Sequence, residues 1–157
     1  YQEFMVDAPQ VFPLYEEAAA LHLPVTFHTG RDPLSPDLIH APAEKMARIA
    51  DLFPQMTIIA AHMGGMSTPE EADAFLVGKP NVYLDTAFIS HFLTPEQAAP
   101  MMRRHGLDRI LFASDSPWSR SCDELDFLQQ CGFTSSELEL ILGENARRLL
   151  KISKSDL

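Results

Sequence analysis

The stretch "RILFASDSPW", residues 109–118, changes from apolar to polar without a spacer. The apolar residues Ile110 to Ala113 are followed at once by Ser114 and Asp115. A short apolar run bounded by turn residues is typical of a strand that is covered on both faces. The stretch therefore predicts a buried strand near 110–114 with a carboxylate at its C-terminal end.

Three further runs of this kind come earlier in the chain. They read "PVTFH", "MTIIAAH" and "NVYLD", and they predict strands near 25–28, 57–62 and 82–85. The starts of the runs are spaced about 25 to 32 residues apart, which is the size of a βαβ unit. The segments between them carry helical signals, so the sequence predicts an α/β fold with parallel strands.

Several helix ends can be predicted from local patterns. Thr68, Thr94 and Thr134 each stand three residues before Glu or Gln, which is the capping-box pattern. Pro follows Thr68 and Thr94 at the first helical position. Gly143 is the expected end of the helix that Thr134 begins.

The four predicted strands share a second property, because each ends in an ionisable residue. These residues are His28, His62, Asp85 and Asp115. In parallel α/β folds, ligands and catalytic groups gather at the C-terminal edge of the sheet. A His or Asp after a strand is more often a capping or loop residue, and this alternative applies most to Asp85 taken alone.

Small residues follow both histidines, in "HTG" and "HMGG", and allow the backbone to turn sharply beside each imidazole. Two imidazoles and a carboxylate suit a divalent ion. The sequence therefore predicts His28, His62 and Asp115 as metal ligands, with Zn²⁺ first and Mn²⁺ or Fe²⁺ as alternatives.

Other polar residues are candidates for contact with a substrate. Arg31 can hold a carboxylate bidentately, although a solvated loop Arg is the commoner case. His91 lies after the third strand, and Trp118 is either a pocket wall or a loop anchor. Asp85 completes this set. His22, His40 and His105 are expected in loops or at helix ends.

Composition narrows the function classes. A chain of 157 residues with a net charge of −10 fits a single domain, residues 1–157, and disfavours nucleic acid as a partner. No apolar run is long enough for a membrane span. Cys122 and Cys131 are expected to be free thiols, which favours the cytoplasm. No phosphate-binding loop and no G-x-S-x-G motif occurs.

Five segments, in this order and spacing, resemble the C-terminal half of the amidohydrolase-related metal-dependent hydrolases. They are "LPVTFHTG", "FPQMTIIAAHMGG", "NVYLDTA", "DRILFASDSPW" and "ILGENARRLL". That family has (β/α)₈ barrels, the TIM-barrel fold, and includes nonoxidative decarboxylases. The resemblance implies half of such a barrel, lacking the N-terminal strands.

The resemblance also implies roles for the strand-end residues. His28 would be the metal-binding histidine of strand five. His62 would be the strand-six histidine, which activates water or substrate or binds a second metal. Asp115 would bind metal and accept a proton from water, so the resemblance implies Asp115 and His62 as the catalytic residues. Asp85 would close strand seven.

The strand-one H-x-H pair of that family does not occur in these residues. We therefore expect either a piece of a longer enzyme or a chain that completes its barrel with another half, in a homo-oligomer or with a missing N-terminal half. The expected activity is hydrolysis of a small ester, lactone or amide. The alternatives are nonoxidative decarboxylation of a small aromatic acid, and an inactive fragment or assembly module with an incomplete site. The TatD-type nucleases fit less well.

Overall fold

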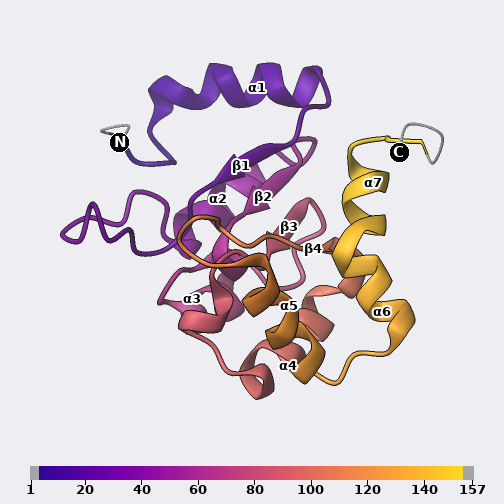
Figure 1. Ribbon diagram of the computed structural model, residues 1–157. Helices are drawn as coiled ribbons and strands as arrows, with labels where there is room; N and C mark the ends of the chain where they lie inside the picture. Colours follow the sequence, from indigo (N-terminus) through magenta and orange to yellow (C-terminus); the bar gives the residue numbers. More distant parts are fainter. Residues whose placement is uncertain (1–3, 154–157) are drawn as a thin grey trace. The chain divides into compact units, whose positions relative to one another are not determined.

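The computed structural model describes residues 4–153, in which strands and helices alternate (Figure 1). The strands are β1 (Val25–Phe27), β2 (Ile58–Ala60), β3 (Val82–Asp85) and β4 (Ile110–Leu111). The helices are α1 (Phe12–Ala20), α2 (Ala43–Leu52), α3 (Pro69–Phe75), α4 (Pro95–His105), α5 (Ser121–Gln130), α6 (Ser135–Glu139) and α7 (Asn145–Leu149). The chain divides into two compact units, Tyr1–Asp85 and Thr86–Leu157.

Short helical turns complete the described residues. They are the 3-10 turns η1 (Pro9–Val11), η2 (His62–Gly64), η3 (Ile89–His91) and η4 (Leu107–Arg109), and the π-helical segment η5 (Leu140–Glu144). The turn η2 closely follows β2 and contains His62. The turn η3 comes after the loop that follows β3 and contains His91.

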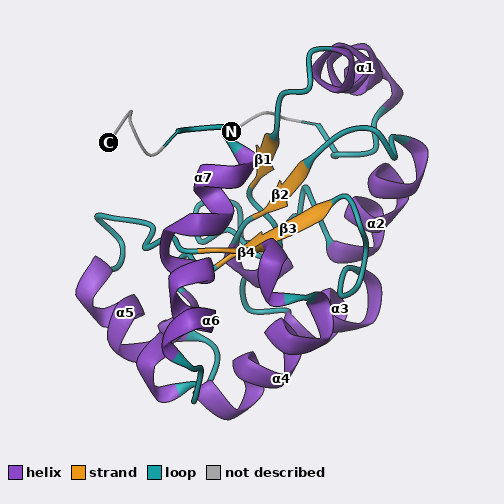
Figure 2. Ribbon diagram, turned by 90° about the vertical axis from the view of Figure 1, so that its right-hand side faces the viewer, coloured by secondary structure: helices purple, strands orange, loops and turns teal. Residues whose placement is uncertain are grey.

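The first unit contains a parallel sheet. β1 pairs with β2 and β2 pairs with β3, which aligns Phe27 with Ala60 and Ala60 with Leu84. Figure 2 shows these strands side by side, each separated from the next along the chain by a helix. This is the predicted βαβ arrangement, and it brings the residues that follow β1 and β2 to one edge of the sheet.

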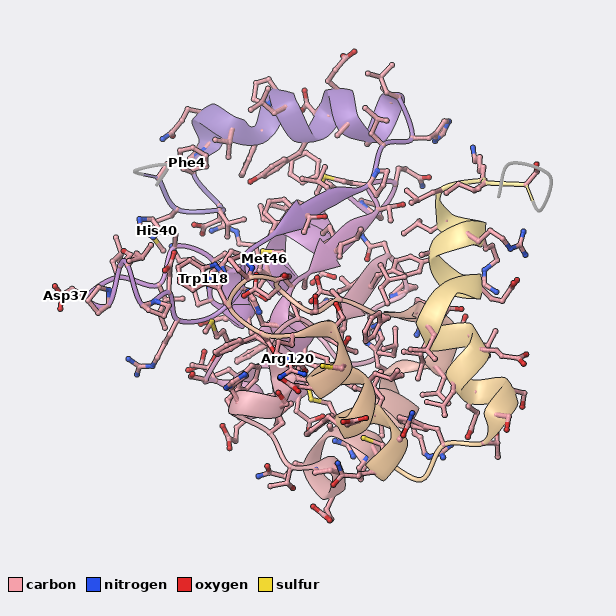
Figure 3. All side chains as sticks on the ribbon, viewed as in Figure 1. Phe4, Asp37, His40, Met46, Trp118 and Arg120 are labelled. Atoms are coloured by element: carbon pink, nitrogen blue, oxygen red, sulfur yellow. The ribbon has the colours of Figure 1, made fainter. Side chains whose placement is uncertain are left out.

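Buried apolar side chains and aromatic contacts stabilise the first unit. Met46 of α2, labelled in Figure 3, is fully buried, as are Ile49 and Ile58. The rings of Tyr15 and Phe53 meet edge to face, with centroids 5.5 Å apart. Edge-to-face contacts of this kind add to the gain from burying the rings themselves.

In the second unit, side-chain hydrogen bonds hold the short strand β4 in place. The Asn145 amide donates to the carbonyl oxygens of Leu107 and Ile110 at 2.7 and 2.8 Å. Thr86 donates its N–H to Leu111 at 3.0 Å, and its hydroxyl both donates to and accepts from the backbone of Ala113. Because a side chain takes over these bonds, the ladder ends earlier than the predicted strand over 110–114.

The capping predictions have mixed outcomes. Thr94 and Thr134 form complete capping boxes with Gln97 and Glu137, as predicted. The prediction for Thr68 is wrong, because its hydroxyl makes no cap hydrogen bond and is buried without a partner. The backbone of Thr68, at φ −138° and ψ 48°, is not extended as it is at Thr94 and Thr134.

The prediction that Gly143 ends a helix is also wrong. Gly143 lies within η5, and the helical path continues through it into α7. A backbone bond from Phe112 N–H to the Ile141 carbonyl, at 3.0 Å, ties this segment to the end of β4.

Two composition-based predictions can be compared with the structure. Cys122 and Cys131 are free cysteines, as predicted. Within residues 4–153, no helix has both the length and the apolar character needed to cross a bilayer.

Candidate active site

Two histidine side chains meet at the edge of the sheet in the first unit. His28 directly follows β1, and His62 opens the turn η2 after β2. The Nδ1 atom of His28 lies 3.1 Å from the Nε2 atom of His62. His62 is 4% exposed, whereas His28 is open to solvent. The structure therefore brings together two of the residues that the sequence predicts for a metal site.

A backbone carbonyl fixes the tautomer of His28. The Nε2 atom of His28 lies 3.1 Å from the carbonyl oxygen of Arg31. A carbonyl can only accept, so Nε2 carries the proton, and in the neutral ring Nδ1 keeps a lone pair. That lone pair faces His62. A histidine that donates one ring N–H to a carbonyl and offers the other nitrogen is the usual arrangement of a metal ligand.

The loops that carry the two histidines are locked together through their backbones. Met66 N–H donates to Thr29 O at 2.8 Å, and Arg31 N–H donates to Met66 O at 2.9 Å. Gly30, at φ +85°, lies between these bonds, and a Cβ there would stand 2.3 Å from the Met66 nitrogen. The close approach therefore requires glycine, which explains the "HTG" sequence after β1.

Asp85 holds the turn that presents His62. Three successive residues of η2 have positive φ angles, 59° at His62, 54° at Met63 and 80° at Gly64. Such a conformation is costly for residues with side chains. The buried Asp85 carboxylate accepts the backbone N–H of His62 at 2.9 Å and offsets part of this cost. The structure thus gives Asp85 a contact with the His62 backbone, while its predicted substrate contact stays a prediction.

The remaining candidate residues of the first unit lie in loops or at helix ends. The Arg31 side chain is exposed, so the group that reaches His28 is its carbonyl. His40 lies half-buried in the long loop between β1 and α2, and Figure 3 shows Asp37 at the outer end of that loop. His22 is exposed just after α1.

In the second unit, Asp115 begins a tight turn. It has a φ of +64°, and its carbonyl accepts the N–H of Trp118 at 2.8 Å. Trp118 is 69% exposed. The ring of His91 stacks on Phe88, with centroids 3.9 Å apart and planes 9° from parallel. By contrast, His105 is buried at the end of α4, where the sequence predicted a helix end.

One residue of the second unit escaped the sequence-based search. Glu124 is fully buried and accepts hydrogen bonds from Ser90 and Ser119. It shares the buried face of α5 with Phe127 and Leu128. An acidic residue in phase with that apolar stripe was the signal in the sequence.

The family follows from the sequence as a whole. A model of the amidohydrolase family matches residues 2–152, nearly the full length of the chain. The chain belongs to the amidohydrolase family. No curated protein matches it.

Several solved structures share the fold of this chain. An uncharacterised TIM-barrel protein from Bordetella bronchiseptica is 24% identical, with a TM-score of 0.75 over 94% of this chain and 52% of that one. Amidohydrolase 2 from Bifidobacterium longum subsp. infantis is 21% identical, with a TM-score of 0.70 over 93% and 57%. A dihydroxybenzoic acid decarboxylase from Polaromonas, with bound manganese and 2-nitroresorcinol, is 20% identical, with a TM-score of 0.69 over 98% and 57%.

These similarities confirm the predicted fold class, an α/β chain that corresponds to part of a TIM barrel. The chain spans just over half the length of each of the three structures. At such low sequence identities the solved structures show the fold alone. The reaction of this chain must be inferred from its own residues.

The spacing of the histidine pair can be compared with that of two ligands of one divalent ion. Two neighbouring nitrogen ligands of one zinc ion, each about 2.0–2.1 Å from the metal, lie roughly 2.9–3.4 Å apart. The observed separation of 3.1 Å lies inside this range. Among residues 4–153, no group of three or more His, Cys, Asp and Glu side chains has the arrangement to hold a metal. The same separation suits the hydrogen bond between the two rings, so the two nitrogens are candidate ligands, and a full coordination shell needs further donors.

Proposed function

We propose that this amidohydrolase chain carries the two-histidine part of a metal site in a hydrolase of small esters, lactones or amides. The observation that supports the proposal is the pairing of His28 Nδ1 with His62 Nε2, with the tautomer of His28 set by the Arg31 carbonyl. Family membership supports an enzyme. Because the chain spans just over half the length of the solved relatives, the activity of a whole enzyme is part of the proposal.

The cofactor in this proposal is a divalent ion held by His28 and His62. Zn²⁺ suits imidazole nitrogen, and Mn²⁺ is the alternative because the Polaromonas decarboxylase contains manganese. When bound, such an ion would supply Lewis acidity and would lower the pKa of water toward neutrality, so that hydroxide forms at about pH 7.

Each candidate residue has a proposed task. Where His62 does not ligate the ion, its Nε2–H donates instead to the oxygen that gains negative charge as the substrate carbonyl is attacked. Asp115 accepts the proton of the attacking water and delivers it to the leaving group. We propose that Arg31, His91, Trp118 and Asp85 contact or frame the substrate.

Decarboxylation of a small aromatic acid is the second candidate. It is favoured by the Polaromonas structure, whose fold this chain shares and whose name gives a dihydroxybenzoic acid as substrate. In that reaction a protein acid protonates the ring carbon from which CO₂ leaves. Both candidate reactions use the same histidine pair, so they are distinguished by the substrate that is converted.

Calorimetric titration of the chain with Zn²⁺ and with Mn²⁺ tests the metal site. We expect His28→Ala to lower the affinity at least tenfold, since one of two paired ligands is lost. His22→Asn is the matched control, because His22 is an exposed histidine of the same unit and Asn tolerates its positive φ. Equal affinities in the wild type and His28→Ala would remove the basis of the proposal.

Product analysis of the metal-loaded chain tests the reaction. Acid release from a panel of esters and lactones, lost in Asp115→Asn, supports hydrolysis. Release of CO₂ from hydroxybenzoates supports decarboxylation instead. If neither product forms while metal binds at His28, the chain by itself is a noncatalytic metal-binding module, and both reactions are refuted for it.

A further inference from the structure

We infer that Glu124 is a positioning residue that fixes the Asp115 turn against the segment that carries His91. The inference rests on the proposed function for the roles of Asp115 and His91. Its structural part, the link between the two segments, stands on contacts within the second unit alone.

The carboxylate of Glu124 joins two segments that are distant in sequence. Its Oε1 atom accepts the hydroxyls of Ser90 and Ser119, both at 2.7 Å. Its Oε2 atom accepts the backbone N–H of Ser90 at 3.1 Å. Ser90 lies in η3 beside His91, and Ser119 ends the turn that begins at Asp115. A single side chain therefore sets the spacing of both segments.

Burial makes this link stiff. Glu124 has no exposed surface, and Ser119 is 5% exposed. A carboxylate removed from water is costly unless hydrogen bonds satisfy it, so its donors cannot move away independently. Glu124 also lies in the first turn of α5, where the helix dipole favours negative charge.

The turn itself depends on its anchored end. The Asp115 carbonyl accepts the N–H of Trp118 at 2.8 Å and that of Ser119 at 3.4 Å. Asp115 has a positive φ, a costly backbone conformation that is readily lost when no other contact holds the turn. Figure 3 labels Trp118 and Arg120 on the stretch that leads from this turn into α5. Release of Ser119 therefore frees the residues that hold Asp115.

Two substitutions distinguish the effect of the Glu124 hydrogen bonds from that of the space its side chain fills. Glu124→Ala removes all three acceptor contacts. Glu124→Gln can keep them, because its amide oxygen accepts the Ser90 N–H while its NH₂ donates to the two hydroxyls, which accept as well as donate. We expect the Gln variant to restore what the Ala variant loses. Asp126→Ala is the control, since Asp126 is an exposed acidic residue of the same helix.

Trp118 is the only tryptophan of the chain, so its fluorescence reports on the turn without a mutation at the reporter. We expect Glu124→Ala to increase the local motion of the indole in time-resolved anisotropy. We also expect the amide of Trp118 to exchange with solvent about tenfold faster or more, as loss of a charged hydrogen bond predicts. Glu124→Gln and Asp126→Ala should remain close to the wild type.

The inference is overturned if Glu124→Ala leaves the anisotropy and exchange of Trp118 unchanged, or if Glu124→Gln is as mobile as Glu124→Ala. Should Glu124→Ala fail to fold, Ser119→Ala removes one contact and gives the same test. These measurements need neither metal nor substrate, so their outcome is separate from that of the proposed function. If a reaction is found, kcat should fall about tenfold in Glu124→Ala and recover in Glu124→Gln; an unchanged kcat overturns the positioning role.

Discussion

Replacing Gly30 with Ala should separate the two loops that hold the histidine pair. A Cβ at this position would lie 2.3 Å from the Met66 nitrogen and 2.6 Å from its carbonyl oxygen, both backbone atoms. Ordinary contact begins near 3.4 Å, so the two backbones must move apart by about 1 Å. Because the obstruction is backbone, no side-chain rotation relieves it.

The cost can be worked out from the contacts. The displacement breaks or weakens the bonds that join Thr29 and Arg31 to Met66, worth about 1 kcal/mol each. Alanine at a φ of +85° adds roughly 1 kcal/mol. The free energy of unfolding should therefore fall by about 3 kcal/mol, which lowers Tm by roughly 6–12 °C for a chain of this size.

Gly78→Ala is a matched control for this prediction. Gly78 has a φ of +86°, and a Cβ there would meet no atom within 4 Å. It carries the same backbone penalty without the collision, so we expect a loss of about 1 kcal/mol. The difference between the two variants then measures the close approach of the loops.

Urea denaturation at fixed pH, followed by circular dichroism, gives both free energies. Zinc titration of the folded variants adds a second measurement, since a shift of about 1 Å takes the imidazole nitrogens out of the range for one ion. We expect Gly30→Ala to bind Zn²⁺ more weakly and Gly78→Ala to bind as the wild type does. Equal destabilisation of the two variants, or equal zinc affinity, would refute the reasoning.

Three further predictions concern single side chains. Asp85→Ala should lower the free energy of unfolding by about 2 kcal/mol, and Asp85→Asn by much less, because the amide oxygen can still accept the His62 N–H; urea denaturation checks this. Asn145→Ala leaves two backbone carbonyls near β4 without their donor, so urea denaturation should show a loss of about 2–3 kcal/mol. Burial, and secondly the nearby charge of an aspartate, raise the pKa of Tyr15 from 10.0 to about 12. The folded state thus holds the proton more tightly, and stability that is complete below pH 10 should be lost as pH rises toward 12; Tyr15→Phe should show a smaller loss in alkaline titrations.

The order of strands and helices could be predicted because its signals are local. Apolar runs such as "NVYLD" and the capping boxes at Thr94 and Thr134 depend on neighbouring residues alone. The same pattern at Thr68 gave a wrong prediction, since a capping box also requires an extended backbone at its first residue. Residue types do not specify that conformation.

The convergence of His28 and His62 could be predicted for a different reason. Both follow parallel strands that pair with each other, so their positions are set by the register of the sheet. Glu124 was missed because its partners, Ser90 and Ser119, lie in segments whose meeting depends on tertiary structure. A buried acidic residue in an apolar stripe indicates that hydrogen-bond donors lie near it, but the sequence does not show which residues they are.

The tautomer of His28 shows most clearly what sequence reasoning leaves out. The side chain of Arg31 was predicted as the functional group, but its carbonyl is what orients His28. Every residue has a carbonyl, so no residue type at position 31 reveals that contact. It depends on the path of the loop, which Gly30 makes possible by approaching Met66. The tautomer of His28 therefore depends on Gly30, two residues later in the chain. A strand-end histidine followed closely by a glycine thus says more about a site than either residue alone.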